Sequence, residues 1–126
     1  MANGTGLDGM LLASRDPERL REWYACALEP QEVSEVDHYR ILTFRGFYLI
    51  IDSRDDIAAT NPDPGRVILN FDVEDARAAV KRIEEAGTRW VAPLEDRDGS
   101  LMATATDPDG NYVQVIQLSE AHRAAM

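Results

Sequence analysis

The chain has 126 residues and a mass of 14.1 kDa, which is enough for one domain of ordinary size. Its composition, 44% hydrophobic and 29% charged, is that of a globular protein and excludes intrinsic disorder. Thirteen basic against twenty-three acidic residues give a net charge of −10, which argues against nucleic-acid binding. The same charge attracts cations, although it is also explained by solubility alone.

Neither a leader nor a membrane anchor is indicated. The first residues contain no basic cluster followed by an apolar run, and no stretch approaches the roughly 18 apolar residues of a transmembrane helix. We therefore expect a cytoplasmic protein without a membrane partner. The single cysteine, Cys26, excludes an intramolecular disulfide and a multi-cysteine metal site, and its apolar surroundings favour a buried thiol.

The first elements predicted in chain order are a strand, a helix and three more strands. The apolar run at residues 10–14 has strand length, and Asp16-Pro17 after it is typical of a helix start. Apolar residues then recur at helical spacing until Pro30 ends the helix. Strand-like runs follow at 31–36, 39–44 and 47–52, and the short breaks between them favour antiparallel hairpins.

After an aperiodic stretch at 53–65, the same order of elements begins again. The run 67–71 predicts a strand, Asp72 is placed to cap the next helix, and Gly87 is placed to end it. Further strands are predicted near 89–92 and at 101–106 and 112–118, with a strong turn signal at 107–111. Placing Asp16 on Asp75 aligns the halves at a constant offset of 59 residues, which indicates a repeated unit.

With these elements the chain resembles the vicinal oxygen chelate superfamily, which includes glyoxalase I, extradiol dioxygenases and bleomycin-resistance proteins. The resemblance spans about residues 7–118 and is carried by Ser14-Arg15-Asp16 with Trp23-Tyr24, by 71–75 with 85–87, and by Asp-Pro-Asp-Gly-Asn at 107–111. It implies an α+β fold of two βαβββ modules whose sheets curve round a cavity, and a homodimer. We expect one domain made of module 7–53, linker 54–65 and module 66–118, with a tail at 119–126.

The resemblance also implies where a metal would be held in metal-dependent members, by His, Glu or Gln from the first and fourth strands of each module. By spacing, these positions correspond to Gly9, Ile50, Ile68 and Gln114, of which only Gln114 has a side-chain donor. We therefore expect the fold without metal or other cofactor, and no metal-dependent glyoxalase or dioxygenase activity. The two histidines, His38 and His122, are expected to be solvated residues.

Alternation along the predicted strands places polar and aromatic side chains on the same face as these positions. The candidate ligand-binding residues are Tyr48, Asp52, Arg66, Asn70, Trp90, Met102, Tyr112 and Gln114, and no catalytic residue is assigned. Each has a structural alternative. The amides of Asn70 and Gln114 are suited to bonds across the sheet, and the aromatic residues to a core or interface. For Asp52 and Arg66 the alternative is a surface salt bridge or plain solvation. Trp23, on the apolar stripe of the first helix, is expected in the core.

These residues favour a protein of the glyoxalase/bleomycin-resistance type that binds a small organic molecule, cationic or aromatic, and sequesters it as in antibiotic resistance. The alternative is a metal-independent isomerase, lyase or cyclase, for which Asp52 with Tyr48 or Arg66 is the nearest acid–base candidate. A third reading is an accessory domain with a collapsed cavity, which the bulk of Ile50 and Ile68 permits. Whether the modules pair within one chain or between two is left open.

Overall fold

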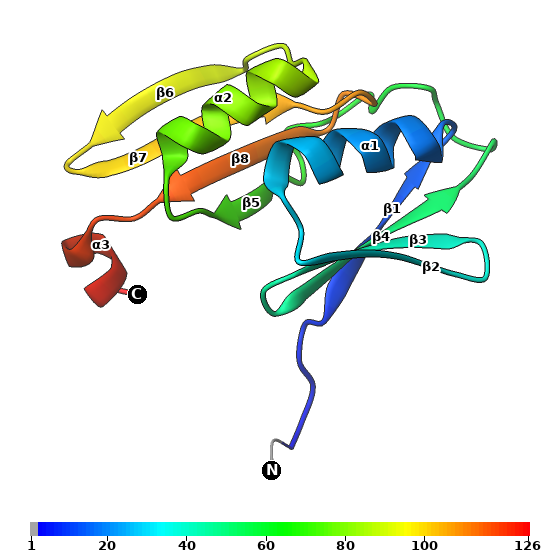
Figure 1. The fold of residues 1–126 in the computed structure, drawn as a ribbon, viewed down its shortest axis with the longest axis horizontal. Coiled ribbons are helices and arrows are strands. Elements are labelled where there is room, and N and C mark those ends of the chain that lie inside the picture. The colour runs from blue at the N-terminus through cyan, green and yellow to red at the C-terminus, as the bar shows by residue number, and fades with distance from the viewer. Residues whose placement is uncertain (1–2) are drawn as a thin grey trace.

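The computed structural model describes residues 3–126, and within them the chain folds as two units with the same order of elements (Figure 1). The first contains β1 (Gly9–Ser14), α1 (Pro17–Leu28), β2 (Glu32–Val36), β3 (Tyr39–Phe44) and β4 (Phe47–Ser53). The second contains β5 (Leu69–Asp72), α2 (Ala76–Ala86), β6 (Ala92–Arg97), β7 (Ser100–Thr106) and β8 (Tyr112–Gln117), followed by the short helix α3 (Glu120–Ala124). The predicted α+β class and the two βαβββ modules are confirmed.

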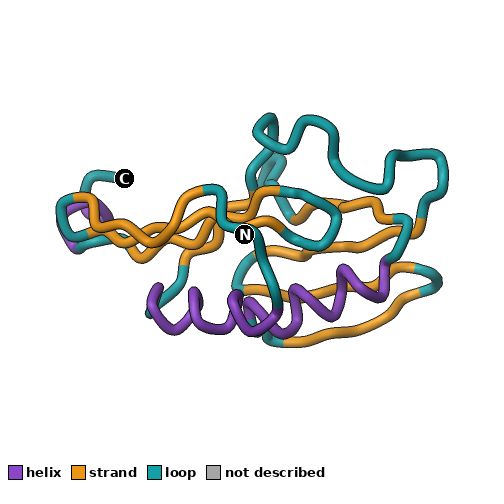
Figure 2. Tube along the Cα trace, turned by 90° about the horizontal axis from the view of Figure 1, so that it is seen from above, coloured by secondary structure: helices purple, strands orange, loops and turns teal. Residues whose placement is uncertain are grey.

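Each module forms one four-stranded mixed sheet, with strand orders β1-β4-β3-β2 and β5-β8-β7-β6. The first strand of each module runs parallel to the last, and the remaining pairs are antiparallel. The sheets are separate, so β1 and β5 are both edge strands. Seen from above, the two helices lie along one side of the molecule and the loop between β4 and β5 extends on the opposite side (Figure 2).

Both helices begin at an aspartate, and these are the two aspartates that the alignment of the halves places on each other. The Asp16 carboxylate accepts the N–H of Arg19 at 3.3 Å, and the Asp75 carboxylate accepts the N–H of Ala78 at 3.1 Å. Asp72 was the wrong prediction for the second cap, because it ends β5 and the helix begins only at Ala76. Gly87 ends α2 as predicted, at a φ of 94° that glycine adopts without strain.

The core lies between the helices and the faces of the sheets that they cover, and it continues across both modules. Trp23 and Tyr24 are buried on α1 and pack edge to face with ring centroids 4.9 Å apart, which confirms the core position of Trp23. Phe44 of the first module meets Phe71 of the second at 5.0 Å. Cys26 points away from this stripe and is exposed, so its predicted burial was wrong.

Two strands of the second module begin later than predicted. Val67 and Ile68 are 56% and 45% exposed and precede β5, and the N–H of Arg66 bonds to Asp63 in a turn. Trp90 lies before β6 instead of within it, and packs against the core. No helix within residues 3–126 has the length and apolar character needed to cross a membrane.

Candidate functional site

The face of the second sheet turned away from α2 carries four of the predicted ligand-binding residues. Asn70 on β5, Gln114 on β8 and Thr104 on β7 are direct cross-strand neighbours, and together they form a polar row. Tyr112 and Met102 share this face with them on either side of Gln114. Amide and hydroxyl groups beside aromatic and thioether side chains give both orienting hydrogen bonds and apolar contact, which small organic ligands require.

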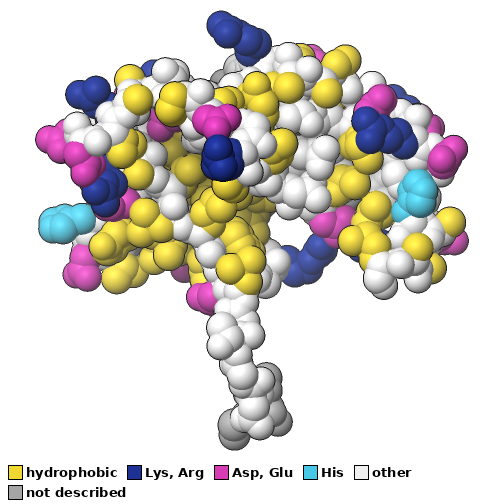
Figure 3. Space-filling model, turned by 180° about the vertical axis from the view of Figure 1, so that it is seen from behind, with side chains coloured by type: hydrophobic (Ala, Val, Ile, Leu, Met, Phe, Trp, Pro, Cys, Tyr) yellow, Lys and Arg dark blue, Asp and Glu magenta, His cyan; other side chains and the backbone are white. Residues whose placement is uncertain are grey.

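The corresponding face of the first sheet carries Tyr48 and Asp52, on either side of Ile50 in β4. Leu11 on β1 lies opposite Ile50 and is 51% exposed, and Tyr48 is 42% exposed. These residues and the Asn70–Gln114 pair lie on different sheets, which share no ladder. Figure 3 shows apolar side chains gathered across the middle of the molecule, on the surface from which the N-terminal segment projects. We call these two uncovered sheet surfaces the open faces.

Two predicted site residues lie on neither open face. Arg66 is in the loop before β5 and forms a surface ion pair with Asp63 at 3.2 Å, which is the structural alternative to a role in ligand binding. Trp90 packs on the helix-covered side, where a ligand of the open faces does not reach it. Asp52 instead borders a shallow surface pocket near His38.

The positions at which the resemblance implies a metal do not suit one. A Cβ atom on Gly9 would lie 2.2 Å from the carbonyl oxygen of Tyr48, so this position has neither a donor nor room for one without backbone movement. Ile68 and Ile50 supply no donor, which leaves Gln114 alone. Across residues 3–126 no three His, Cys, Asp or Glu side chains cluster in a way that would hold a metal ion.

A cleft of about 470 Å³ lies between the two modules, where the end of α1 and the β3–β4 turn meet β5. Its walls are apolar and come from both modules: Met10, Leu28, Phe44, Phe47, Leu69 and Phe71. Arg45 and Asp72 also line it. Of the ligand-binding residues predicted from the sequence, only Asn70 borders this inter-module cleft, so the prediction missed it.

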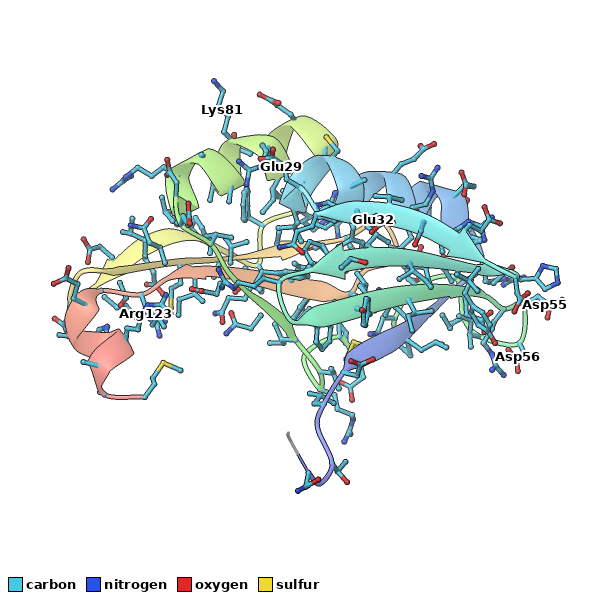
Figure 4. The ribbon with its side chains drawn as sticks, turned by 60° about the horizontal axis from the view of Figure 1, so that its bottom comes forward. Glu29, Glu32, Asp55, Asp56, Lys81 and Arg123 are labelled. Atoms are coloured by element: carbon cyan, nitrogen blue, oxygen red, sulfur yellow. The ribbon has the colours of Figure 1, made fainter. Side chains whose placement is uncertain are left out.

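Asp72 joins three distant segments at this cleft. Its carboxylate accepts hydrogen bonds from Arg123 of α3 at 2.8 Å and from Arg45 of the β3–β4 turn at 2.7 Å. These bonds, that of Arg123 foremost, hold the pKa of Asp72 below its ordinary value, so the carboxylate is charged at neutral pH. Figure 4 places Arg123 beside the second sheet. No sequence motif signals this cluster, because its members come together only through the fold.

A buried carboxylate, Asp107, connects the first module to the 107–111 turn. Its two oxygens accept bonds from the Tyr24 hydroxyl at 2.6 Å, from the Asn111 amide at 2.9 Å, and from the backbone N–H groups of Asp109 and Asn111 at 2.9 and 3.0 Å. Burial raises the pKa of Asp107 despite these bonds, and burial also raises the pKa of Tyr24. Asp107 is 5% exposed, which indicates a structural role.

The two histidines have different surroundings. His38 is exposed at the β2–β3 turn, as predicted. His122 is instead partly buried and its Nδ1 atom is hydrogen-bonded to the hydroxyl of Ser100, which also accepts the N–H of Ser119 at 2.8 Å. This contact fixes α3 against the second sheet, so the expectation of a solvated tail histidine was wrong.

Comparison with known proteins identifies the fold. A family model described as a glyoxalase-like domain matches residues 9–116. A lactoylglutathione lyase of Pseudomonas aeruginosa is 42% identical over 60 residues, which are 47% of this chain and 34% of that protein. The match therefore spans about a third of the length of that relative.

Solved structures resemble nearly the whole chain. The fosfomycin resistance protein of Mesorhizobium loti superposes with a TM-score of 0.70 at 14% identity, covering 98% of this chain and 99% of that one. A glyoxalase/bleomycin resistance protein/dioxygenase family enzyme of Burkholderia phytofirmans gives a TM-score of 0.74 at 14% identity, covering 91% and 100%. At these identities the likeness concerns the fold alone, and the family model over residues 9–116 is what confirms the resemblance drawn from the sequence.

Proposed function

The chain belongs to the glyoxalase-like domain family, and on this premise we propose that it binds a small organic molecule on its open faces, without a metal and without transforming it. The observation that carries this proposal is the polar row of Asn70, Gln114 and Thr104, which is bordered by Tyr112 and Met102. Such a row provides hydrogen bonds that orient a ligand, but it contains no acid or base.

The ligand we propose is a cationic or aromatic compound of the antibiotic class, which the protein sequesters. The net charge of −10 favours cations, and Tyr112 and Tyr48 offer flat surfaces for stacking. We further propose that a second copy of the chain covers the open faces. The exposure of Leu11 and Tyr48, at 51% and 42%, is consistent with a surface completed by a partner.

Calorimetric titration with metal-free bleomycin, a cationic and aromatic probe, tests this function in a chelator-treated sample. We expect binding, and we expect the double variant Asn70→Ala/Gln114→Ala to bind about thirtyfold more weakly, since each of the two lost hydrogen bonds costs about 1 kcal/mol. The control is Gln31→Ala, which removes an exposed amide that lines the inter-module cleft. Absence of binding at millimolar probe, or weakening in the control alone, contradicts the proposal.

A second measurement separates binding from catalysis. After prolonged incubation with the protein, the probe is recovered and its mass is compared with that of a sample kept without protein. We expect the mass to be unchanged. A changed mass that depends on the protein would favour the metal-independent enzyme over the binding protein.

A further inference from the structure

The inter-module cleft differs from the open faces in its position and in its walls. It lies on the side of the sheets where the core residues Phe44 and Phe71 meet, and both of these rings line it. Its volume of about 470 Å³ falls within the roughly 300–1,000 Å³ of small-molecule sites. The open faces share Ile68 and Asn70 with the border of this cleft, and the proposed function does not otherwise use this space.

A cluster of Arg45, Asp72 and Arg123 at the edge of the cleft carries an excess of positive charge in a protein whose net charge is −10. Arg45 and Asp72 line the cleft, and Arg123 lies beside the lining through its contact with Asp72. Arg45 and Arg123 both contact Asp72, which leaves one positive charge uncompensated within this cluster. Glu29, the other acidic residue of the lining, is paired with Arg82 at 2.9 Å and does not neutralise it. Figure 4 shows Glu29 near the place where α1 and α2 meet.

Both arginines keep donors available to a ligand. Each contacts Asp72 through its Nη2 atom, while the side chains of Arg45 and Arg123 are 70% and 56% exposed. A guanidinium has five N–H donors in a rigid fork, so one contact to Asp72 leaves further N–H groups directed at solvent. A planar carboxylate matches this fork better than other anions of its size.

We propose that the inter-module cleft is a second binding site, which takes a small amphipathic monocarboxylate. The apolar body lies between Phe44, Phe47 and Leu69, and the carboxylate binds Arg45 and Arg123 beside Asp72. A single negative charge matches the single uncompensated positive charge, whereas a dianion is repelled by Asp72 and by the charge of the whole protein. The ligand of this site is thus opposite in charge to the cation proposed for the open faces.

Occupation of the site has a consequence for the fold. The carboxylate would connect the β3–β4 turn of the first module with α3, which follows the second module. Because the ligand binds residues of both modules at once, its binding stabilises the arrangement of the modules.

Three probes with the same apolar body and different head groups test the site by calorimetric titration: decanoate, decan-1-ol and decylamine. We expect decanoate to bind about fivefold more tightly than the alcohol, at low ionic strength, and the amine to bind most weakly. Decylamine that binds as tightly as decanoate and changes the amide shifts of Gly46, Leu69 and Val73 overturns the proposal, whereas decylamine that binds only at the open faces belongs to the site proposed there.

Matched variants identify the residues. Arg45→Gln should weaken the binding of decanoate about fivefold and leave the binding of decan-1-ol unchanged, since it removes one donor at the mouth of the cleft. Arg54→Gln is the control, because it removes the same charge from an exposed arginine paired with Asp56 at 2.6 Å, away from the cleft. Asp72→Asn should make decanoate bind about fivefold more tightly, because it removes the carboxylate that competes for the two arginines. Equal effects of Arg45→Gln and Arg54→Gln, or weaker binding in Asp72→Asn, contradict the assignment.

Amide chemical shifts recorded with decanoate locate the site independently of the variants. We expect changes at Gly46, Leu69 and Val73, and unchanged decanoate affinity in Gln114→Ala, which alters only the open face. Changes centred on Gln114 instead would assign decanoate to the open face and overturn the cleft proposal. The bleomycin titration addresses the open face separately, so either proposal fails or stands without the other.

Discussion

At the scale of single residues, the contact between Tyr24 and Asp107 connects parts of the chain that are 83 residues apart. Both side chains are buried, and the phenol donates to the carboxylate at 2.6 Å. A buried charge is tolerated only when its oxygens are satisfied, and Asp107 accepts four hydrogen bonds. The pair therefore attaches α1 to the turn that precedes β8.

We expect Tyr24→Phe to destabilise the protein by about 1–3 kcal/mol at neutral pH and by less near pH 4. Burial raises the pKa of Asp107, so its contribution to stability is present below its unfolded pKa and is lost as the pH rises through the folded one. The hydrogen bond from Tyr24 lowers the folded-state pKa of Asp107 and so limits the loss of stability as the pH rises. Removing the hydroxyl therefore makes this loss larger. Urea unfolding at both pH values measures the difference.

The matched control is Tyr39→Phe, which alters a side chain that is 40% exposed and should leave the free energy of unfolding unchanged. Glu18 and Asp56 contribute to the pH dependence of stability with a sign opposite to that of Asp107. These contributions cancel when the variant is compared with the wild type at each pH. The pKa values of these carboxylates are lowered by Arg21 and Arg54 respectively, so the stability they provide is lost as the pH falls. A loss in Tyr24→Phe that does not depend on pH would count against this account.

At Gly9 the close approach of two strands leaves no room for a metal-binding side chain. The strand β1 passes so close to β4 that a Cβ atom here would lie 2.2 Å from the Tyr48 carbonyl oxygen. Glycine permits this approach, and any residue with a metal-binding side chain would have to displace the backbone. The same position is the first of those at which the resemblance implies a metal ligand.

At the scale of elements, the repeat is most evident where the helices begin. Asp16 and Asp75 are separated by the offset that aligns the modules, and both carboxylates accept a backbone N–H three residues on. Satisfying these otherwise unpaired donors fixes the first turn of each helix. The helix α2 has no acidic residue in its first turn, and two side chains satisfy its N-terminal donors: Asp75 accepts the N–H of Ala78 and Gln117 accepts the N–H of Ala76 at 2.9 Å.

We expect Asp75→Ala to lower the free energy of unfolding by about 1 kcal/mol through the loss of this cap. The neighbouring substitution Glu74→Ala removes the same charge from an exposed position that caps nothing, and it should have little effect. Chemical denaturation of the two variants side by side measures the difference. Equal losses in both would indicate a general charge effect instead of a cap.

The elements that the sequence predicted well are those with a strong periodic pattern and definite ends. The buried stripe of α1 and the bounds of β3 agree with the structure. The start of β5 and the position of β6 do not, since apolar residues such as Val67 and Trp90 also occur in loops when tertiary packing accommodates them. The helix α3 was missed because five residues carry too little pattern.

At the scale of the whole molecule, the modules are joined on the side of their helices. The helices α1 and α2 contact each other, and Phe44 packs on Phe71 across the boundary. The open faces are consequently left uncovered, with Leu11, Tyr48 and Ile68 exposed. We therefore place the partner surface of the proposed homodimer on the open faces.

Sedimentation equilibrium tests this assembly. We expect the wild type to be a dimer and Leu11→Glu to shift the equilibrium towards monomer, because a charge buried in an apolar interface is costly. Val91→Glu places the same charge on another exposed apolar residue, 46% exposed in the loop before β6, and should stay dimeric. A monomeric wild type, or equal dissociation in both variants, would contradict the assigned surface.

Local periodicity, capping and residue type were enough to predict the repeated βαβββ order, the start of the first helix and the shortage of donors where the resemblance implies a metal. The sequence by itself also placed Asn70, Met102, Tyr112 and Gln114 on one face, since alternation along a strand is local. Only the tertiary structure decided that Arg66 and Trp90 lie elsewhere and that a cleft forms between the modules. Arg45, Asp72 and Arg123 meet through packing of distant segments, and no local pattern encodes such a contact.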